Sequence, residues 1–229
     1  MSIRPVAEDV FQLPLMPRDA INAYLLGDVL VDTGIKQSAG KIAGMLNGRE
    51  VSAIALTHAH ADHAGGMKRL AAQLGVPVWC GAVDREAVET GNPVLSPGLQ
   101  RPGLSTIAAA AGAFDGVHVD RVLREGDALA AGFIVLDTPG HSPGHVSFWR
   151  ESDRTLICGD VFFNMSLLTT VPGLREPPGL LTTDPAKNRD SERRLAELEP
   201  TAVGFGHGPV LSRDAARELR DFVATSHAR

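Results

Sequence analysis

The 229-residue sequence predicts an α/β protein built in four layers, with helices outside and two sheets inside. Two observations indicate this arrangement. Short apolar or alternating runs of strand length fill both halves of the chain, and segments with helical spacing of apolar residues close each half. The length suits one large domain over residues 1–229. Hydrophobic residues make up 44% and charged residues 21%, the ordinary balance of a soluble globular protein.

The first half begins with strands and then alternates strands with helices. The runs FQLPL, INAYLL and VLVDTG are broken by Pro, Asn and Gly, so we expect three short strands. Apolar residues at helical spacing predict a helix from about Ser38 to Leu46, with Gly48 as its stop. VSAIAL is a continuous apolar run, typical of a strand that is buried on both faces. A helix from Met67 to Leu74 and a strand VPVWC are expected next.

The second half returns to strands after a long loop. Residues 91–103 contain three prolines and three glycines, which predict an ordered loop or a lid. Strands are expected at VHVDRVL, FIVLDTPG, HVSFW and TLICGD, and the Pro- and Gly-rich residues 171–181 predict a second lid-like loop. Asp184 is a candidate N-cap for a helix that begins near Pro185. A last strand, AVGFG, and a last helix over about residues 212–224 complete the chain.

The charge and the cysteines limit the partners that the chain can have. The net charge is −5, and this acidic balance disfavours a nucleic-acid partner. The N-terminus lacks a signal-peptide pattern, and no apolar run reaches the ~18 residues of a membrane span. Cys80 and Cys158 lie in apolar runs and are expected to be buried, reduced thiols. We therefore expect a cytoplasmic protein with a small-molecule substrate and no membrane partner; the oligomeric state stays open, with a dimer as one option.

The stretch 57-THAHADHAGG-66 concentrates metal-binding side chains. In an extended segment His58, His60 and Asp62 point the same way, and two imidazoles two residues apart can reach one ion. A turn after His60 would bring Asp62 and His63 to a neighbouring point, so the geometry suits two adjacent metals. The two glycines that close the run are expected to allow a tight turn into the next helix.

Further ligands are needed, since a catalytic zinc usually has three protein groups and a water. His141 follows LDTPG, Asp160 follows LICG and His207 follows VGFG. Each stands after a buried apolar run and a glycine, which is how ligands would reach one edge of a sheet sandwich. His118 and His227 are expected to be ordinary surface or core residues. His145 is expected to begin the next strand, with metal binding or support of a ligand as the alternatives.

HAHADH, TPGHSPGH, CGD and GHG, in this order between about Asp32 and His207, resemble the metallo-β-lactamase fold superfamily of metal-dependent hydrolases. The resemblance implies an αββα sandwich with a dinuclear metal site at its edge. It implies two metal sites that share a bridging Asp160, the first formed by His58, His60 and His141 and the second by Asp62, His63 and His207. It also makes Asp32, in VDTG, a residue that orients a ligand histidine; an aspartate that caps a turn before Gly34 is the alternative.

The implied cofactor is two Zn²⁺ ions per chain, with iron or manganese as alternatives. A hydroxide bridging the two ions would attack the carbonyl carbon of a thioester, an ester or a lactone. Asp62 would be the catalytic residue that passes a proton to the leaving group. Phe162 and Phe163, with Met165 and Leu167, are candidates for an apolar wall of the substrate pocket, and ordinary core is the alternative for them. Lys36, Arg101 and Arg175 are candidates for meeting a substrate carboxylate, as is any other surface cation.

The bridging Asp160 favours the glyoxalase II and lactonase-like branches over the antibiotic-hydrolysing lactamases. Glyoxalase II enzymes usually carry a C-terminal glutathione-binding region, for which little chain follows His207, and Phe163 stands where acyl-homoserine lactonases often have a tyrosine. The alternatives are β-lactam hydrolysis, phosphodiester cleavage and a non-catalytic, metal-stabilised module. A further alternative is a persulfide dioxygenase whose single iron is bound by His58, His141 and Asp160.

Overall fold

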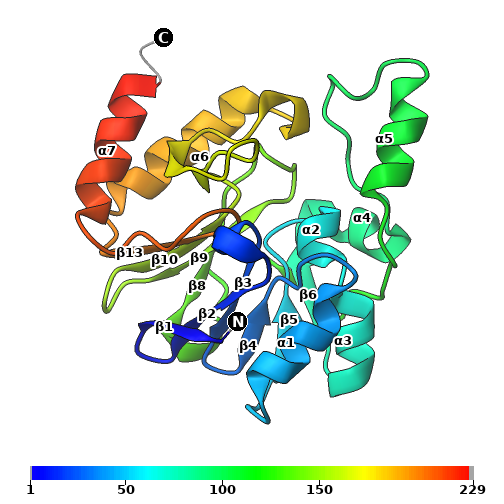
Figure 1. Cartoon of the computed structure of the whole chain (residues 1–229), viewed down its shortest axis with the longest axis horizontal. Helices are drawn as coiled ribbons and strands as arrows, with labels where there is room; N and C mark the ends of the chain where they lie inside the picture. Colours follow the sequence, from blue (N-terminus) through cyan, green and yellow to red (C-terminus); the bar gives the residue numbers. More distant parts are fainter. Residues whose placement is uncertain (1, 227–229) are drawn as a thin grey trace.

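The computed structural model describes residues 2–226 and shows two sheets packed face to face, with helices on both outer sides (Figure 1). The first sheet has seven strands in sequence order. It is antiparallel from β1 to β4 and parallel from β4 to β7. Its strands are β1 (Arg4–Ala7), β2 (Val10–Pro14), β3 (Asn22–Leu26), β4 (Val29–Val31), β5 (Ala53–Ala55), β6 (Val78–Gly81) and β7 (Arg121–Leu123).

The second sheet has four strands in the order β13-β10-β9-β8, and only the β10–β13 pair is parallel. A separate hairpin pairs β11 with β12. The strands of the second sheet and of the hairpin are β8 (Ile134–Asp137), β9 (Val146–Arg150), β10 (Thr155–Gly159), β13 (Ala202–Phe205), β11 (Phe163–Met165) and β12 (Pro172–Arg175).

Helices cover the outer faces of the two sheets. Figure 1 shows α1 and α3 on the side of the first sheet and α6 and α7 on the side of the second. The α-helices are α1 (Ser38–Leu46), α2 (Ala61–Ala64), α3 (Met67–Leu74), α4 (Arg85–Thr90), α5 (Leu104–Gly112), α6 (Pro185–Glu197) and α7 (Ala215–Ser226). Short 3₁₀ turns are η1 (Pro17–Asp19), η2 (Ala82–Asp84), η3 (Ala130–Gly132) and η4 (Gly179–Leu181). Within residues 2–226, none of the helices has the length and apolarity that a bilayer crossing requires.

Three hydrophobic clusters fill the three spaces between the four layers. Alternation along each strand divides the residues between them: in β3, Leu25 packs toward α1 and α3, whereas Tyr24 and Leu26 face the second sheet. The third cluster joins the second sheet to α6 and α7 through residues such as Leu156 and Leu195. The predicted four-layer arrangement is therefore confirmed.

Most predicted elements are present, with the same bounds for α1 and α3. Helix α6 begins at Pro185 as predicted, and its N-cap Asp184 accepts a hydrogen bond from the Lys187 amide. Cys80 and Cys158 are buried and free, also as predicted. The prediction that residues 171–181 form a loop is corrected, because β12 and η4 lie within them. Helix α5 was not predicted from the sequence. The last helix begins at Ala215, three residues later than expected.

Candidate metal centre

Four of the predicted ligands stand just after strands that end at one edge of the sandwich, whereas Asp62 and His63 lie in the short helix α2, which His60 precedes. His58 follows β5, His141 follows β8, Asp160 follows β10 and His207 follows β13. Strands β8, β10 and β13 run in the same direction, so their carboxyl ends meet at this edge. The structure therefore brings side chains from both sheets to one point.

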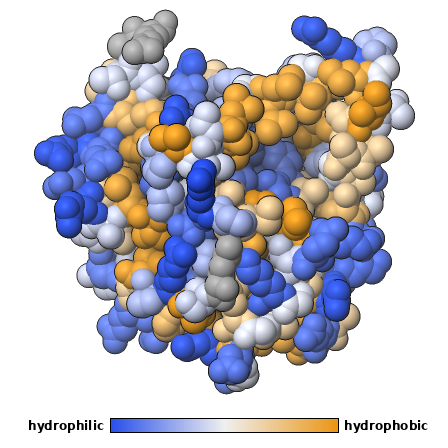
Figure 2. Space-filling view, in the orientation of Figure 1, coloured by the Kyte–Doolittle hydropathy of each residue, from blue (hydrophilic) through white to orange (hydrophobic). Residues whose placement is uncertain are grey.

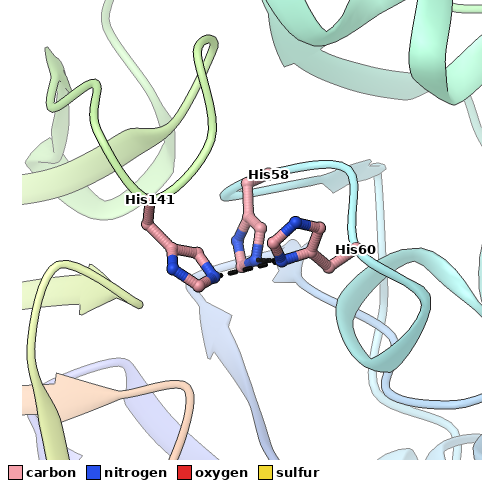
Figure 3. A group of neighbouring side chains, drawn as sticks. All are labelled: His58, His60 and His141. Carbon is pink, nitrogen blue, oxygen red and sulfur yellow. Dashed lines mark hydrogen bonds between the residues drawn. The ribbon is translucent and has the colours of Figure 1, made fainter. Parts of the chain in front are cut away.

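Three histidines form the first group. The His60 Nδ1 atom lies 3.0 Å from His58 Nε2 and 3.0 Å from His141 Nε2. Figure 3 shows the three rings turning these nitrogens toward a common centre, with His141 reaching in from a different loop. These are the residues that the sequence grouped as the first metal site.

A second group lies beside the first and shares Asp160 with it. His207 Nε2 is 3.3 Å from Asp62 Oδ2, and His63 is close enough to join the same group. The Oδ2 atom of Asp160 lies 3.2 Å from His207 Nε2, 3.3 Å from His63 Nε2 and 3.4 Å from His141 Nε2. Asp160 therefore occupies the position between the two groups.

The donor atoms fit divalent metal ions. Atoms that bind one tetrahedral zinc at about 2.0 Å lie roughly 3.3 Å from one another. The separations given above are 3.0 to 3.4 Å, and His58 Nε2 lies 3.8 Å from Asp160 Oδ2. Among the described residues, three buried side-chain atoms have no hydrogen-bond partner, and two of them, His63 Nε2 and Asp160 Oδ1, lie in this site. Buried polar atoms normally have partners, and a bound ion would satisfy both.

The outward-facing nitrogens of four ligand histidines have partners of their own. His63 Nδ1 lies 2.8 Å from Asp32 Oδ2, and His207 Nδ1 lies 2.6 Å from the Ala20 carbonyl oxygen. His58 and His141 meet threonine hydroxyls in the same way, at Thr57 and Thr182. Such partners fix each ring and direct the Nε2 lone pair inward. The prediction that Asp32 orients a ligand histidine matches this placement.

Burial and the neighbouring charges shift the pKa values of the ligand histidines. Burial, helped by neighbouring histidines, lowers the pKa of His58 and of His141. Burial would also lower the pKa of His207, but Asp160 and Asp62 raise it to about 10. The three-histidine group therefore contains neutral rings with free lone pairs, which is the form that binds a metal ion.

Asp84 connects the two ligand loops and was missed in the sequence. Its carboxylate is wholly buried and accepts three hydrogen bonds: from the Ala59 amide (2.9 Å), the Ser142 hydroxyl (2.7 Å) and the Gly144 amide (2.7 Å). Ala59 stands between His58 and His60, and Ser142 follows His141. One carboxylate thus holds both sides of the three-histidine group. Its only signal in the sequence is an acidic residue shortly after the apolar strand VPVWC.

Close packing, and not a special backbone conformation, explains the two glycines after the motif. Gly65 and Gly66 have φ of −61° and −86°, which any residue can adopt. A Cβ atom at Gly65 would lie 2.3 Å from the Ala61 carbonyl oxygen, and one at Gly66 would lie 2.6 Å from the Thr33 carbonyl oxygen. The turn therefore depends on glycine as expected, through the close approach of other backbone atoms.

A cavity of about 570 Å³ opens above the metal-binding side chains. Phe163 lines it and packs against the His207 ring at 4.4 Å between centroids. The prediction for Phe162 is corrected, because that ring is fully buried in the third core cluster against Phe222. Neighbouring side chains along an irregular segment point in different directions, which sequence proximity to Asp160 cannot show. Of the other two candidates, Leu167 lines the cavity and Met165 is buried.

The remaining histidines take other roles or lie outside the described residues. His145 is buried, and its Nε2 accepts a hydrogen bond from the Asp160 amide at 3.1 Å, so it supports the backbone of Asp160. His118 is exposed beside Glu89. His227 lies outside the residues that the structure describes.

Comparison with known proteins defines the class of the chain. Residues 16–207 match the family model described as the metallo-beta-lactamase superfamily. The chain is 29% identical to the probable metallo-hydrolase YflN of Bacillus subtilis, over 85% of this chain and 81% of that protein. It is 30% identical to a hydroxyacylglutathione hydrolase of Bdellovibrio bacteriovorus, over 60% of this chain but only 44% of that enzyme. Among solved structures, TTHA1623 in a di-iron-bound form is 33% identical, with a TM-score of 0.65 over 88% of this chain and 94% of that one.

The chain belongs to the metallo-β-lactamase superfamily, because the family model covers most of its length. Within that superfamily it is a metal-dependent hydrolase. Its solved relatives share the fold over nearly the whole chain.

Proposed function

We propose that this protein hydrolyses a small acyl compound, namely a thioester, an ester or a lactone, with two divalent metal ions. The observation that carries the proposal is the pair of donor groups that share Asp160 at the base of an open cavity. His58, His60 and His141 would hold one ion, and Asp62, His63 and His207 the other. Bound metal ions supply an activated water near neutral pH and polarise the carbonyl oxygen of the substrate.

The protein side chains would position the substrate and transfer its proton. Asp62 lines the cavity, and 37% of its side chain is exposed, so it can reach both the metal site and a leaving group. We assign to it the transfer of a proton to that group. Phe163 would pack against the substrate beside His207.

The metal and the compartment belong to the same proposal. We favour zinc, since the donor set of histidines and carboxylates is typical of catalytic zinc sites, and the di-iron form of TTHA1623 makes iron the main alternative. The buried free thiols Cys80 and Cys158 are typical of cytoplasmic proteins. We therefore propose that the reaction takes place in the cytoplasm.

The proposal is tested by metal analysis followed by substrate assays on one sample. Protein purified without added metal should contain about two ions per chain, and it should hydrolyse members of a panel of thioesters, esters and lactones, with β-lactams and phosphodiesters as comparisons. His60→Ala and Asp160→Ala should lose at least about 100-fold in kcat/KM, whereas His118→Ala, at an exposed site, should keep the activity. Unchanged hydrolysis in both site variants would reject the assignment, and one iron with persulfide-dependent oxygen uptake would establish the dioxygenase.

A further inference from the structure

Most of the exposed large apolar side chains belong to two segments beside the cavity, and five of them line it: Val94, Leu104, Ile107, Leu167 and Leu181. Eleven large hydrophobic residues are exposed among those described, and only Met16, Val83 and Ile134 lie elsewhere. The other eight belong to two segments that flank the metal centre, which we call the α5 arm (residues 93–112) and the opposite rim (residues 167–181). Figure 2 shows hydrophobic surface gathered along the edges of a hollow in this region of the molecule. Apolar surface of this extent on a soluble protein usually marks a binding site.

Helix α5 turns an apolar face toward the cavity and not toward the core. Leu104, Ile107, Ala108 and Ala111 all line the cavity, and they follow the i, i+3, i+4, i+7 spacing of one helical face. No residue of α5 is buried, and Ile107 is 67% exposed. In Figure 1 this helix stands apart from the body of the protein. A ligand that lies against this face would remove its apolar side chains from water.

The arm and the rim are joined to each other and to the body of the protein. The Ser96 hydroxyl donates a hydrogen bond to the Leu180 carbonyl oxygen, which links the two segments across the cavity. Just beyond α5, Asp115 forms an ion pair of 2.9 Å with Lys36. The walls of the cavity are therefore held at two points. Lys36 pairs with Asp115 and does not line the cavity.

The cavity divides into a metal-binding floor and apolar walls. The floor consists of His60, Asp62, His141, Asp160 and His207. Apart from these ligands, Ser96 is the single polar side chain among the described lining residues, and its hydroxyl is already bonded to Leu180. A charged group placed against such walls would lose its water without gaining a partner.

We propose that the substrate carries an aliphatic acyl chain of medium length, which lies between α5 and the opposite rim while its carbonyl meets the metal centre. This inference rests on the proposed function, and it names the part of the substrate that the enzyme recognises. The volume of about 570 Å³ falls within the usual range for small-molecule sites. The leaving group points to the open mouth and contributes little to recognition.

A series of p-nitrophenyl esters from acetyl to decanoyl tests the inference with the metal-loaded enzyme. For the wild-type protein, kcat/KM should rise by roughly two- to fourfold per methylene group until the chain fills the cavity. Ile107→Ser should lower kcat/KM for the decanoyl ester by about tenfold, with the acetyl ester changed by less than twofold. Ile107→Trp should fill the space and move the optimum to shorter chains. The control Val83→Ser changes an equally exposed apolar residue, 63% exposed and outside this cavity, and it should reproduce the wild-type series.

The outcomes separate the two proposals. Metal-dependent hydrolysis of the acetyl ester with no rise along the series would overturn the acyl-chain inference and leave the hydrolase function intact. The same holds if both Ile107 variants give the wild-type chain-length profile. If neither these esters nor the matching acyl thioesters and lactones are hydrolysed in a metal-dependent way, the proposed function is rejected and the inference with it.

Discussion

At the scale of single residues, four of the ligand histidines have a polar partner behind the ring. Asp32 holds His63 from an unusual backbone conformation, with φ of 62°, while its other oxygen accepts a hydrogen bond from the Thr57 amide. Aspartate tolerates this left-handed region better than most residues. Asp84 plays a comparable part for the three-histidine group. The ligands can be moved only together with these partners.

The first prediction concerns Asp84→Asn. All three groups that face this carboxylate are donors, so an amide would place its own N–H group against one of them. The two ligand loops should separate slightly, and the affinity for the first metal ion should fall by about 10- to 100-fold. Titration of metal-free protein with Co²⁺, followed through its visible spectrum, measures this affinity directly.

Asp120→Asn is the matched control. That carboxylate accepts a hydrogen bond from the amide of Val78, at the start of β6, whereas Asp84 lies just after the end of β6. The control variant should bind Co²⁺ as the wild-type protein does. Equal affinities in the two variants would show that Asp84 supports the fold without positioning the ligands.

The second prediction concerns Glu192, whose side chain is fully buried in α6 and accepts a hydrogen bond from Asn188. Burial, reinforced by the charge of Glu176, raises the pKa of Glu192 to about 8, against about 4.5 in the unfolded chain. The unfolded state therefore loses this proton first, and the free energy of unfolding falls as pH rises from about 4.5 to about 8, by at most about 1.4 kcal/mol per pH unit. Arg189 and Arg193 lie nearby and oppose part of this effect.

Glu192→Gln removes the titration and should flatten the fall in stability over that range, as measured by urea unfolding between pH 5 and pH 8. Glu197→Gln makes the same chemical change on the exposed side of α6 and should keep the wild-type slope. Identical slopes in all three proteins would mean that Glu192 is already ionised at neutral pH.

At the scale of elements, strong patterns were predictable and weak ones were not. Buried runs such as VSAIAL and TLICG became strands because both of their faces are covered, and the helix start at Pro185 followed from its N-cap and its proline. Helix α5 was not predictable, because its apolar face meets a cavity and its sequence has no charged residue and no N-cap side chain. Strand β12 was not predictable, because its proline and glycine residues are unusual in strands. It tolerates them since it pairs with β11 alone, in a short hairpin.

The third prediction concerns the start of α6. The Asp184 carboxylate accepts the Lys187 amide hydrogen bond at 3.0 Å, so Asp184→Ala should lower the free energy of unfolding by about 1 kcal/mol. The amide of residue 184 would still bond to the Gly140 carbonyl oxygen, which leaves the His141 loop in place. Catalytic rates should therefore stay within about twofold. A large loss of activity with unchanged stability would contradict this separation.

At the scale of the whole molecule, the metal centre joins the two halves of the chain. Four ligands come from the segment after β5, and three come from the ends of strands in the second sheet. The ligand types and their order along the chain could be read from HAHADH, GH, CGD and GHG. Which atoms meet, and which neutral or charged partners stand behind them, depends on contacts between residues far apart in sequence, such as His207 with Ala20.

The fourth prediction follows from this junction. Ions that bind the folded state alone stabilise it by about 2.7 kcal/mol at 100 times their dissociation constant, so a chelator should lower the melting temperature by roughly 5–10 °C for a protein of this size. Calorimetry with and without chelator measures the shift. Asp160→Ala lacks the shared ligand and should respond much less to the chelator; an equal response would place the stabilising ion elsewhere.

Helix α5 lies outside the hydrophobic core, and this has a consequence for how such a protein can evolve. Folding depends on three clusters to which this helix contributes nothing, so mutations along its cavity-facing side are nearly neutral for stability. Gene copies that inherit the same metal centre can therefore diverge quickly in the compounds they accept, while the reaction itself is inherited unchanged. Among such descendants, sequence differences concentrated in residues 93–112 would indicate a change of substrate, and not a change of the reaction.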